Sequence, residues 1–525
     1  MITKINEKLN CNKKLYLILF VGVLLRVCFL GAHPIGLHHD EAYMGYETWA
    51  LLNYGMDSNC YSWPVYFISW SSGMNVLYSY LSIPFVALFG LNQFSIRIVQ
   101  ALFGCLSLPL FYALLRKFLN ENESLFGLLL LAINPWHVSM SRWALESNLA
   151  PFFVLLTTFL LCEYLEGNKK ALFFAALSIG LSLYSYAILW MFLPLYLLAF
   201  LFVAIYTGKF KPGKEIIPAL ITLILLATPL FLFLAVNYGL LPEMNILCFS
   251  IPKLPDFRGG EVGGSLIDNI ILLLDMLLRQ NGYPGATSIQ LSGNYYLLLT
   301  PFIIYGFIIC LKRFMELLKT KEFNYESIIF IWFICAIIIA STIPLLNTNR
   351  ANYLHMPIVV FSIIGILKCV EKLPKAKLGI TLLLFVSFLT FIIPFSIFNN
   401  GYRSQMAYDY ADAIKFADQY REENGGDLDI LVGGIYHSHI LFDQKPSPKE
   451  FYENMERDPR YGIDPLSEVI RQHFTHYKHY VFEIKMDEIP KANSIYILPN
   501  YSAQKLVNDY DMEILYSTSQ YSVLK

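Results

Sequence analysis

Long apolar runs dominate the first 400 or so residues, and they come in blocks rather than in an alternating pattern. Many blocks reach the roughly 20 residues that a helix needs to cross the hydrocarbon core of a bilayer. Lysine and arginine favour the cytoplasmic side of short loops. With this bias the pattern predicts eleven crossings, an N-terminus inside and a C-terminus outside. The predicted spans are 15–32, 97–117, 124–140, 149–165, two within 171–207, 216–235, 295–311, 327–344, 354–370 and 378–397.

One apolar segment, Val76–Gly90, does not fit this alternation. It is short and contains Pro84. If it crossed the membrane, Arg116 and Lys117 would lie outside, and the later basic loops would be inverted as well. We therefore expect a juxtamembrane or re-entrant helix here.

The last part of the chain has the pattern of a small soluble α/β domain. Its apolar residues first follow helical spacing and then form short runs typical of strands. We therefore predict a transmembrane domain over 1–399 and an extracytoplasmic domain over 400–525. The expected elements of the second domain are a helix through Tyr410, Ala413, Ile414 and Ala417, strands at 428–432, 479–484 and 494–498, and a hairpin at 513–525.

The composition is typical of a multi-pass membrane protein, so we expect the lipid bilayer to be one of its partners. Hydrophobic residues make up 56% of the 525 residues and charged residues 15%, against about 25% charged in soluble proteins. The net charge of −1 gives no basis for binding nucleic acid. The abundance of Lys, Ile and Asn has a bacterial character, so we expect a bacterial plasma membrane.

The first candidate site follows the first span, where His38, His39, Asp40 and Glu41 are consecutive. A carboxylate beside the membrane can take the proton of an acceptor hydroxyl as a general base. Acidic residues at a helix start also cap its free N–H groups and suit its dipole. The sequence leaves both interpretations open.

Two further polar clusters fall on the predicted outer side. In 141–148, Arg142 and Glu146 stand four residues apart, so a helix would place them on one face, where they could form a local ion pair. In 347–353, Arg350 precedes a span. The planar fork of arginine suits phosphate, although an arginine at a span end can also reach out to the interface.

Three other ionisable residues stand out. Arg26 is the one charge within the first span, where it either faces the protein interior or reaches the interface. His437 and His439 could bind a metal, but an isolated His-x-His is a weak signal. We interpret both histidines as surface residues.

Together these residues resemble the membrane glycosyltransferases of the GT-C fold, in the branch of the protein O-mannosyltransferases and the lipid A aminoarabinose transferases. A first span with Arg26 leads to the Asp-Glu pair, and 74–97 is similar to the segment that follows this pair in the family. The stretch 135–146 is similar to the second acidic motif, and 350–357 to the late motif.

The resemblance implies an inverting sugar transfer from a polyprenyl-phosphate carrier to a hydroxyl on protein, glycan or lipid, at the outer face. Asp40 would deprotonate the acceptor, and Arg350 with Arg142 would offset the charge of the leaving phosphate. Glu146 and Glu41 would orient the acceptor or hold a cation. Some relatives use a divalent metal ion, for which the candidate ligands are the two histidines His38 and His39.

The chain also departs from the family pattern. Many members carry Lys-Pro-Pro-Leu after the first loop, whereas 73–77 reads Gly-Met-Asn-Val-Leu, without the lysine expected at the donor phosphate. Glu146 stands where Asp is commoner.

Two other functions compete with this one. A polysaccharide polymerase or ligase would use a lipid-diphosphate donor in the same setting. A transporter or flippase would hold its working charges near the bilayer midplane, but here the carboxylates lie at the outer ends of the spans. A convergence of Asp40, Glu146 and Arg350 on one cavity would favour an enzyme.

Overall fold

The computed structural model describes residues 2–70, 73–255, 257, 263–280, 292–395, 406–457, 474–482, 489 and 491–525. The chain divides into two compact units, each of which is described by itself. Unit 1 comprises Met1–His33, Arg97–Phe231 and Gly259–Tyr402, and unit 2 comprises Pro34–Ile96, Leu232–Arg258 and Arg403–Lys525. The predicted boundary at residue 399 lies outside the described residues and stays a prediction.

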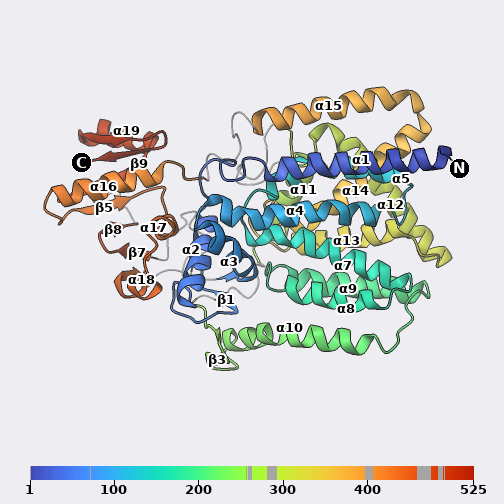
Figure 1. Ribbon diagram of the computed structural model, residues 1–525, viewed down its shortest axis with the longest axis horizontal. Helices are drawn as coiled ribbons and strands as arrows, with labels where there is room; N and C mark the ends of the chain where they lie inside the picture. The colour runs from blue at the N-terminus through green and yellow to red at the C-terminus, as the bar shows by residue number, and fades with distance from the viewer. Residues whose placement is uncertain are drawn as a thin grey trace. The chain divides into compact units, whose positions relative to one another are not determined.

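Unit 1 is built from apolar helices that run roughly along one direction (Figure 1). α12 packs against α13 and α14, α7 against α8, and α1 against α5. The helices are α1 (Ile2–Val27), α4 (Gln93–Leu115), α5 (Glu121–Ala132), α6 (Pro135–Met140), η1 (Glu146–Leu149), α7 (Ala150–Leu165), α8 (Lys170–Ser182), α9 (Leu189–Tyr206), α10 (Ile216–Asn237), α11 (Leu266–Leu278), η2 (Leu297–Leu299), α12 (Thr300–Thr320), α13 (Tyr325–Ala340), η3 (Asn352–Leu354), α14 (His355–Lys372), η4 (Pro374–Ala376) and α15 (Lys377–Ile393), of which α4 and α10 continue into unit 2.

Each predicted span overlaps a helix, but α1 ends at Val27 rather than near residue 32, and the span predicted at 124–140 is broken after Ala132, where Asn134 and Pro135 start the separate helix α6. Among the described residues, seven helices are long and apolar enough to cross a membrane, namely α4, η1 with α7, α9, α10, η2 with α12, η3 with α14, and η4 with α15. The other four predicted spans fall on α1, which begins among the N-terminal basic residues, and on the shorter α5, α8 and α13. The end of the last predicted span, 396–397, lies outside the described residues.

The end of α5 explains why Arg26 is buried. The helix stops at Ala132, because Asn134 caps the next helix and Pro135 occupies its first turn. The last carbonyls of the helix then have no further helical turn after them, although that of Leu131 still accepts the N–H of Asn134 at 3.3 Å. The Arg26 guanidinium donates to the carbonyls of Leu131 and Ala132, at 3.1 and 3.0 Å. The side chain is 0% exposed, so Arg26 faces the protein interior and not the interface.

Unit 2 combines a helical part with a mixed sheet. The first part holds α2 (His39–Tyr54), α3 (Leu77–Phe89) and the two hairpins β1–β2 and β3–β4; α3 is the helix expected at 76–90. The remaining elements are β1 (Tyr66–Phe67), β2 (Met74–Asn75), β3 (Met244–Ile246), β4 (Phe249–Ile251), α16 (Tyr410–Glu423), β5 (Asp429–Val432), α17 (His437–Gln444), α18 (Pro448–Asn454), β6 (Met455–Arg457), β7 (Phe474–Tyr477), β8 (Tyr480–Val481), β9 (Ser494–Pro499), α19 (Asn500–Tyr510), β10 (Ile514–Ser517) and β11 (Tyr521–Leu524).

The α/β character predicted for the C-terminal part is confirmed. Its sheet has the order β10-β11-β9-β5-β8-β7-β6, with β5 parallel to β8 and β9 and the other pairs antiparallel. The expected strands match β5, β8 and β9, and the expected hairpin is β10–β11. Residues 483–484 of the second expected strand lie outside the described residues. Alternate residues of β9, Tyr496 and Leu498, pack against Ala503 and Leu506 of α19.

Helix α17 of this C-terminal part packs on α2. A Cβ placed on Gly45 of α2 would lie 2.6 Å from the Phe442 ring, so the two helices approach closely there. The Tyr46 hydroxyl donates to the carbonyl of Pro446 at 2.9 Å. The helix that starts at the Asp-Glu pair is therefore tied to the C-terminal sheet within one unit.

In unit 1, two glycines allow α12 and α14 to approach at backbone distance. A Cβ on Gly306 would lie 1.9 Å from the carbonyl oxygen of Phe361, and a Cβ on Gly365 would lie 1.9 Å from that of Phe302. Because lipid tails are as apolar as the side chains, membrane helices associate largely through such close packing of small residues.

We expect Gly306→Ala to destabilise unit 1 markedly, because the new methyl group would push against backbone rather than against a side chain that can move. Overpacking typically costs about 1–3 kcal/mol. Gly379→Ala on α15 is the matched control, since a Cβ there meets nothing within 4 Å. Thermal unfolding of the purified protein should show a lower midpoint for the first variant only. Equal midpoints for both variants would contradict the packing described here.

Candidate functional site

The start of α2 is held by a reciprocal capping box. His38 is the N-cap residue, and its Nδ1 accepts the backbone N–H of Asp40 at 3.2 Å. The carboxylate of Glu41 accepts the backbone N–H of His38 at 3.1 Å. Glu41 is 0% exposed. The capping interpretation of the acidic pair therefore holds for Glu41, whose catalytic role stays a prediction.

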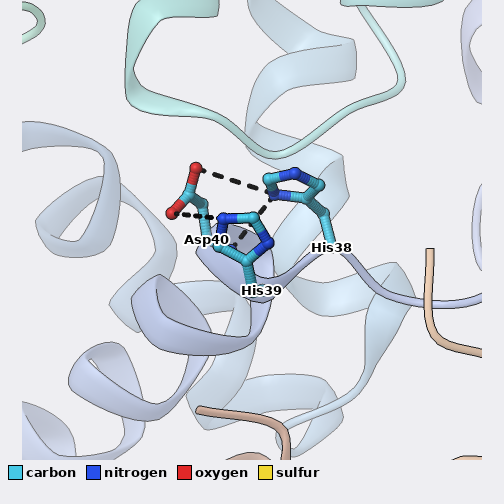
Figure 2. A group of neighbouring side chains, drawn as sticks. All are labelled: His38, His39 and Asp40. Atoms are coloured by element: carbon cyan, nitrogen blue, oxygen red, sulfur yellow. Dashed lines mark hydrogen bonds and ion pairs between the residues drawn. The ribbon is translucent and has the colours of Figure 1, made fainter. Parts of the chain in front are cut away.

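Asp40 has a different environment from its neighbour. Its side chain is 27% exposed, and its two carboxylate oxygens each lie 3.6 Å from a histidine nitrogen, of His38 and of His39 (Figure 2). The indole Nε1–H of Trp70 donates to Oδ1 of Asp40 at 3.2 Å. The carboxylate is thus oriented from one side and remains accessible.

Burial keeps both histidines neutral. It lowers the pKa of His38 to about 3, with a smaller contribution from His439. It also lowers the pKa of His39 to about 3, where nearby His38 adds to the effect and Asp40 opposes it. A metal-binding histidine has to be neutral, so at neutral pH neither imidazole would first have to lose a proton.

His38, His39 and Asp40 fit a divalent ion because both imidazoles are neutral and because the three ligand atoms lie close together. They all lie within 4.8 Å of one another, and the two nitrogen-to-oxygen distances are 3.6 Å. Zinc bonds of 2.0–2.1 Å in a tetrahedron separate the ligand atoms by about 3.3 Å. The side chains would have to move inward slightly, and ligation through Nδ1 of His38 would replace the N–H of Asp40 that this nitrogen accepts in the capping box.

The second polar cluster is not helical as expected. α6 ends at Met140 and η1 begins at Glu146, so no single helix joins Arg142 to Glu146, and the condition for placing them on one helical face is not met. Arg142 instead donates to the carbonyls of Leu25 and His33, at 3.1 and 3.0 Å, in and beyond the last turn of α1. The carbonyl of Leu25 needs a donor because α1 ends two residues later, at Val27.

The second and third clusters meet inside unit 1. The side-chain amide of Asn352 donates to Oδ1 of Asn148 at 2.5 Å and to the carbonyl of Ser147 at 3.3 Å. Near them in the sequence, Arg350 is partly exposed and donates to the carbonyl of Pro344 at 2.8 Å. Arg142, Glu146 and Arg350 thus belong to unit 1, whereas Asp40 belongs to unit 2, so their convergence stays a prediction.

The surface interpretation of His437 and His439 is wrong, because each is 2% exposed. Nδ1 of His439 accepts the backbone N–H of Tyr436 at 3.1 Å, which leaves the proton on Nε2 to donate to the carbonyl of Leu37 at 3.0 Å. Burial lowers the pKa of His439 to about 4. The C-terminal part thereby binds the residue just before the capping box.

Comparison with known proteins gives one family and several solved structures. Residues 75–233 match the family described as dolichyl-phosphate-mannose-protein mannosyltransferase. The structure of ArnT from Cupriavidus metallidurans bound to undecaprenyl phosphate is similar over 97% of both chains, with a TM-score of 0.56 and 10% identity. The chain has the GT-C fold.

The oligosaccharyltransferase of Archaeoglobus fulgidus in its apo form is also similar, with a TM-score of 0.46 and 14% identity. The match covers 83% of this chain but only 64% of the archaeal one, so the chain spans about two thirds of that protein. A search among curated protein sequences finds no match. The resemblance inferred from the sequence is confirmed at the level of the GT-C fold, and the chain is an integral membrane protein.

Sequence reasoning missed two residues near Asp40 in this GT-C chain. Trp70 gave no signal because its role depends on a contact across 30 positions of sequence. Glu47 lies two turns after Asp40 on α2 and is 0% exposed. It accepts hydrogen bonds from the backbone N–H of Ser58, at 2.9 Å, and from its hydroxyl. Burial raises the pKa of Glu47 to about 7, although the bonds from Ser58 oppose the shift.

Glu47 predicts a defined pH dependence of stability. Its pKa is higher in the folded state than the ordinary 4.5, so its contribution is full below pH 4.5 and is lost as the pH rises through about 7. Glu47→Gln resembles the protonated form, and we expect its thermal midpoint to gain on that of the wild type between pH 5 and pH 8. Glu422→Gln, at an exposed position, should show no such trend. A constant difference for Glu47→Gln at all pH values would contradict the shift.

Proposed function

We propose that this protein is a membrane glycosyltransferase that moves a sugar from a polyprenyl-phosphate carrier to a hydroxyl acceptor at the outer face of the membrane. The observation that carries the proposal is the Asp40 carboxylate. It is accessible, oriented by Trp70 and set at a capped helix start in a chain with the GT-C fold. Glu41 is engaged in the capping box, so Asp40 is the better base of the two.

In the proposed reaction, the acceptor oxygen attacks the anomeric carbon from the side opposite the phosphate. The new carbon–oxygen bond forms as the bond to the phosphate oxygen breaks, and its electron pair leaves with the lipid phosphate. The acceptor proton passes to Asp40, and the anomeric configuration inverts. Because the lipid phosphate is a good leaving group, the reaction needs no strong general acid.

Arg350 is the proposed contact to the donor phosphate. It is partly exposed, and one of its nitrogens donates to Pro344. Arg142 is only 2% exposed, and two of its nitrogens donate to backbone carbonyls, so we give it a supporting part in offsetting the charge. The similar ArnT structure is bound to undecaprenyl phosphate, which supports a lipid monophosphate rather than a diphosphate as the carrier.

A divalent ion is the proposed cofactor, with His38, His39 and Asp40 as its ligands. When bound, it would supply positive charge beside the reacting oxygens. Glu146 is proposed to orient the acceptor. The acceptor hydroxyl belongs to a protein, a glycan or a lipid on the outer face of a bacterial plasma membrane.

Asp40→Asn tests the base. In a full-length protein reconstituted in nanodiscs, we expect the wild type to release or transfer labelled sugar from polyprenyl-phosphate donors. Loss of a general base should lower turnover by about 10²- to 10⁴-fold. Asp511→Asn, an exposed aspartate of the C-terminal part, should leave turnover unchanged.

Other outcomes of this assay point elsewhere. Turnover that survives in Asp40→Asn would move the base to another carboxylate, with Glu41 tested next. Turnover only with lipid-diphosphate donors would replace the proposed donor by that of a polymerase or ligase. A folded wild type without turnover on either donor class would favour a transporter.

The metal site has its own test, which needs no turnover. We expect the chelator-treated protein to bind Zn²⁺ in equilibrium dialysis, and His39→Asn to weaken this binding by about tenfold or more, since even outer partners of a metal change affinity that much. His476→Asn, a partly exposed histidine of the C-terminal part, is the control. Equal binding by both variants and the wild type would exclude His39 as a ligand.

A further inference from the structure

Four aromatic side chains gather beside Asp40, two from the segment 38–70 and two from the start of α17. The Trp70 ring lies 5.2 Å from His39, 5.4 Å from Tyr436 and 5.0 Å from His437. It stands nearly perpendicular to His39 and Tyr436, at 89° and 87°. His39 and Tyr436 lie 4.6 Å apart. The rings thus form a corner next to a carboxylate.

The indole in this corner is held by a strained backbone. Trp70 has φ = +50°, a region that a bulky side chain rarely occupies and that costs of order 1–3 kcal/mol. Such strain persists where the surroundings enforce it, and it concentrates at functional sites. Here it accompanies the hydrogen bond from Trp70 to Asp40.

The two residues from the start of α17 are fixed relative to Asp40 as well. His439 lies on the same helix and holds the carbonyl of Leu37 at 3.0 Å. An isolated bridge also pairs Leu37 with Ala407, at the start of the C-terminal part. These contacts to Leu37 give Tyr436 a defined position beside the capping box.

The aromatic cluster beside Asp40 is more exposed than a cluster in a hydrophobic core would be. His437 is buried at 2%, whereas Trp70, Tyr436 and His39 are only partly buried, so part of each of these three rings can be reached. The side chain of Asp40 is also open, at 27%. A buried aromatic cluster that served packing alone would need none of these exposed surfaces.

We propose that Trp70, Tyr436 and His39 form a subsite for a pyranose ring of the acceptor, and hence that the acceptor is a glycan or the sugar headgroup of a glycolipid. A pyranose has an apolar face of C–H groups that stacks on an aromatic ring, while its rim carries hydroxyls. The three aromatic rings would contact the C–H face, and the Asp40 carboxylate would accept a hydrogen bond from a hydroxyl.

This inference rests on the proposed function and deepens it. It gives the C-terminal part a direct share in the active site, because Tyr436 would touch the acceptor while Asp40 takes its proton. A peptide acceptor would present an extended backbone, which seeks hydrogen bonds along its length rather than a corner of rings.

Binding can be tested without any donor by saturation-transfer difference NMR on the full-length protein in nanodiscs free of sugar detergents. The probes are the methyl pyranosides of glucose, galactose and mannose. Glycerol serves as a polyol without an apolar ring face, and a short Ser/Thr peptide as the rival acceptor. We expect saturation of pyranose C–H protons by the wild type, with little signal from glycerol or the peptide.

Three variants locate the subsite. Tyr436→Ala should reduce the pyranoside signal about fivefold, in line with the value of an aromatic contact, whereas Tyr436→Phe keeps the ring and should retain the signal. Tyr510→Ala, at an exposed tyrosine on α19, is the control for loss of a tyrosine elsewhere. Thermal unfolding checks that each variant is folded.

The outcomes separate this inference from the proposed function. A pyranoside signal that is the same in Tyr436→Ala and the wild type, or no pyranoside signal above that of glycerol, would overturn the subsite even if the donor is turned over. A Tyr436-dependent signal from the peptide alone would replace the glycan by a protein acceptor. Pyranoside binding without turnover on any donor would retain the subsite and reject the transferase.

Discussion

Carbonyl groups at helix ends are the constraint that positions two buried arginines of this protein, Arg26 and Arg142. In an apolar environment each such group needs an internal donor, because water is not at hand. The Arg26 guanidinium donates hydrogen bonds to carbonyls at the end of α5, and that of Arg142 donates to the carbonyl of Leu25 in the last turn of α1. Arg350 donates to a loop carbonyl, that of Pro344, beyond the end of α13. Positive charge is therefore present near the polar clusters, but much of it already has a structural partner.

The three carboxylates Asp40, Glu41 and Glu47 lie on the same helix, α2, but in different surroundings. Glu41 is buried and accepts the backbone N–H of His38 in the capping box. Glu47 is buried and accepts hydrogen bonds from the neutral Ser58, so burial prevails and raises its pKa to about 7. The carboxylate of Asp40, in contrast, stays accessible. Three carboxylates of one helix thus have three roles: Glu41 caps the helix, Glu47 is a buried acid, and Asp40 is the candidate base.

Much of the fold was predictable because it depends on local periodicity. The apolar blocks indicated the helices, although not the break after Ala132, and short apolar runs indicated β5 and β9. The partners of Arg142 were not predictable, because the carbonyls of Leu25 and His33 that it binds lie 117 and 109 residues away in the sequence. Burial of His439 was equally invisible, since its partner, the carbonyl of Leu37, lies 402 residues away.

These long-range contacts indicate that the C-terminal part helps to position the segment that carries Asp40. A domain appended for folding or solubility would need only its own core, which the sheet and α19 provide. Here α17 packs on α2, His439 donates to the carbonyl of the residue before the cap, and the Tyr436 ring lies 4.6 Å from that of His39 at a tilt of 40°. Each contact involves the segment that carries Asp40. The geometry of the candidate base is therefore set jointly by the loop after the first span and by residues almost 400 positions later, which no local pattern could reveal.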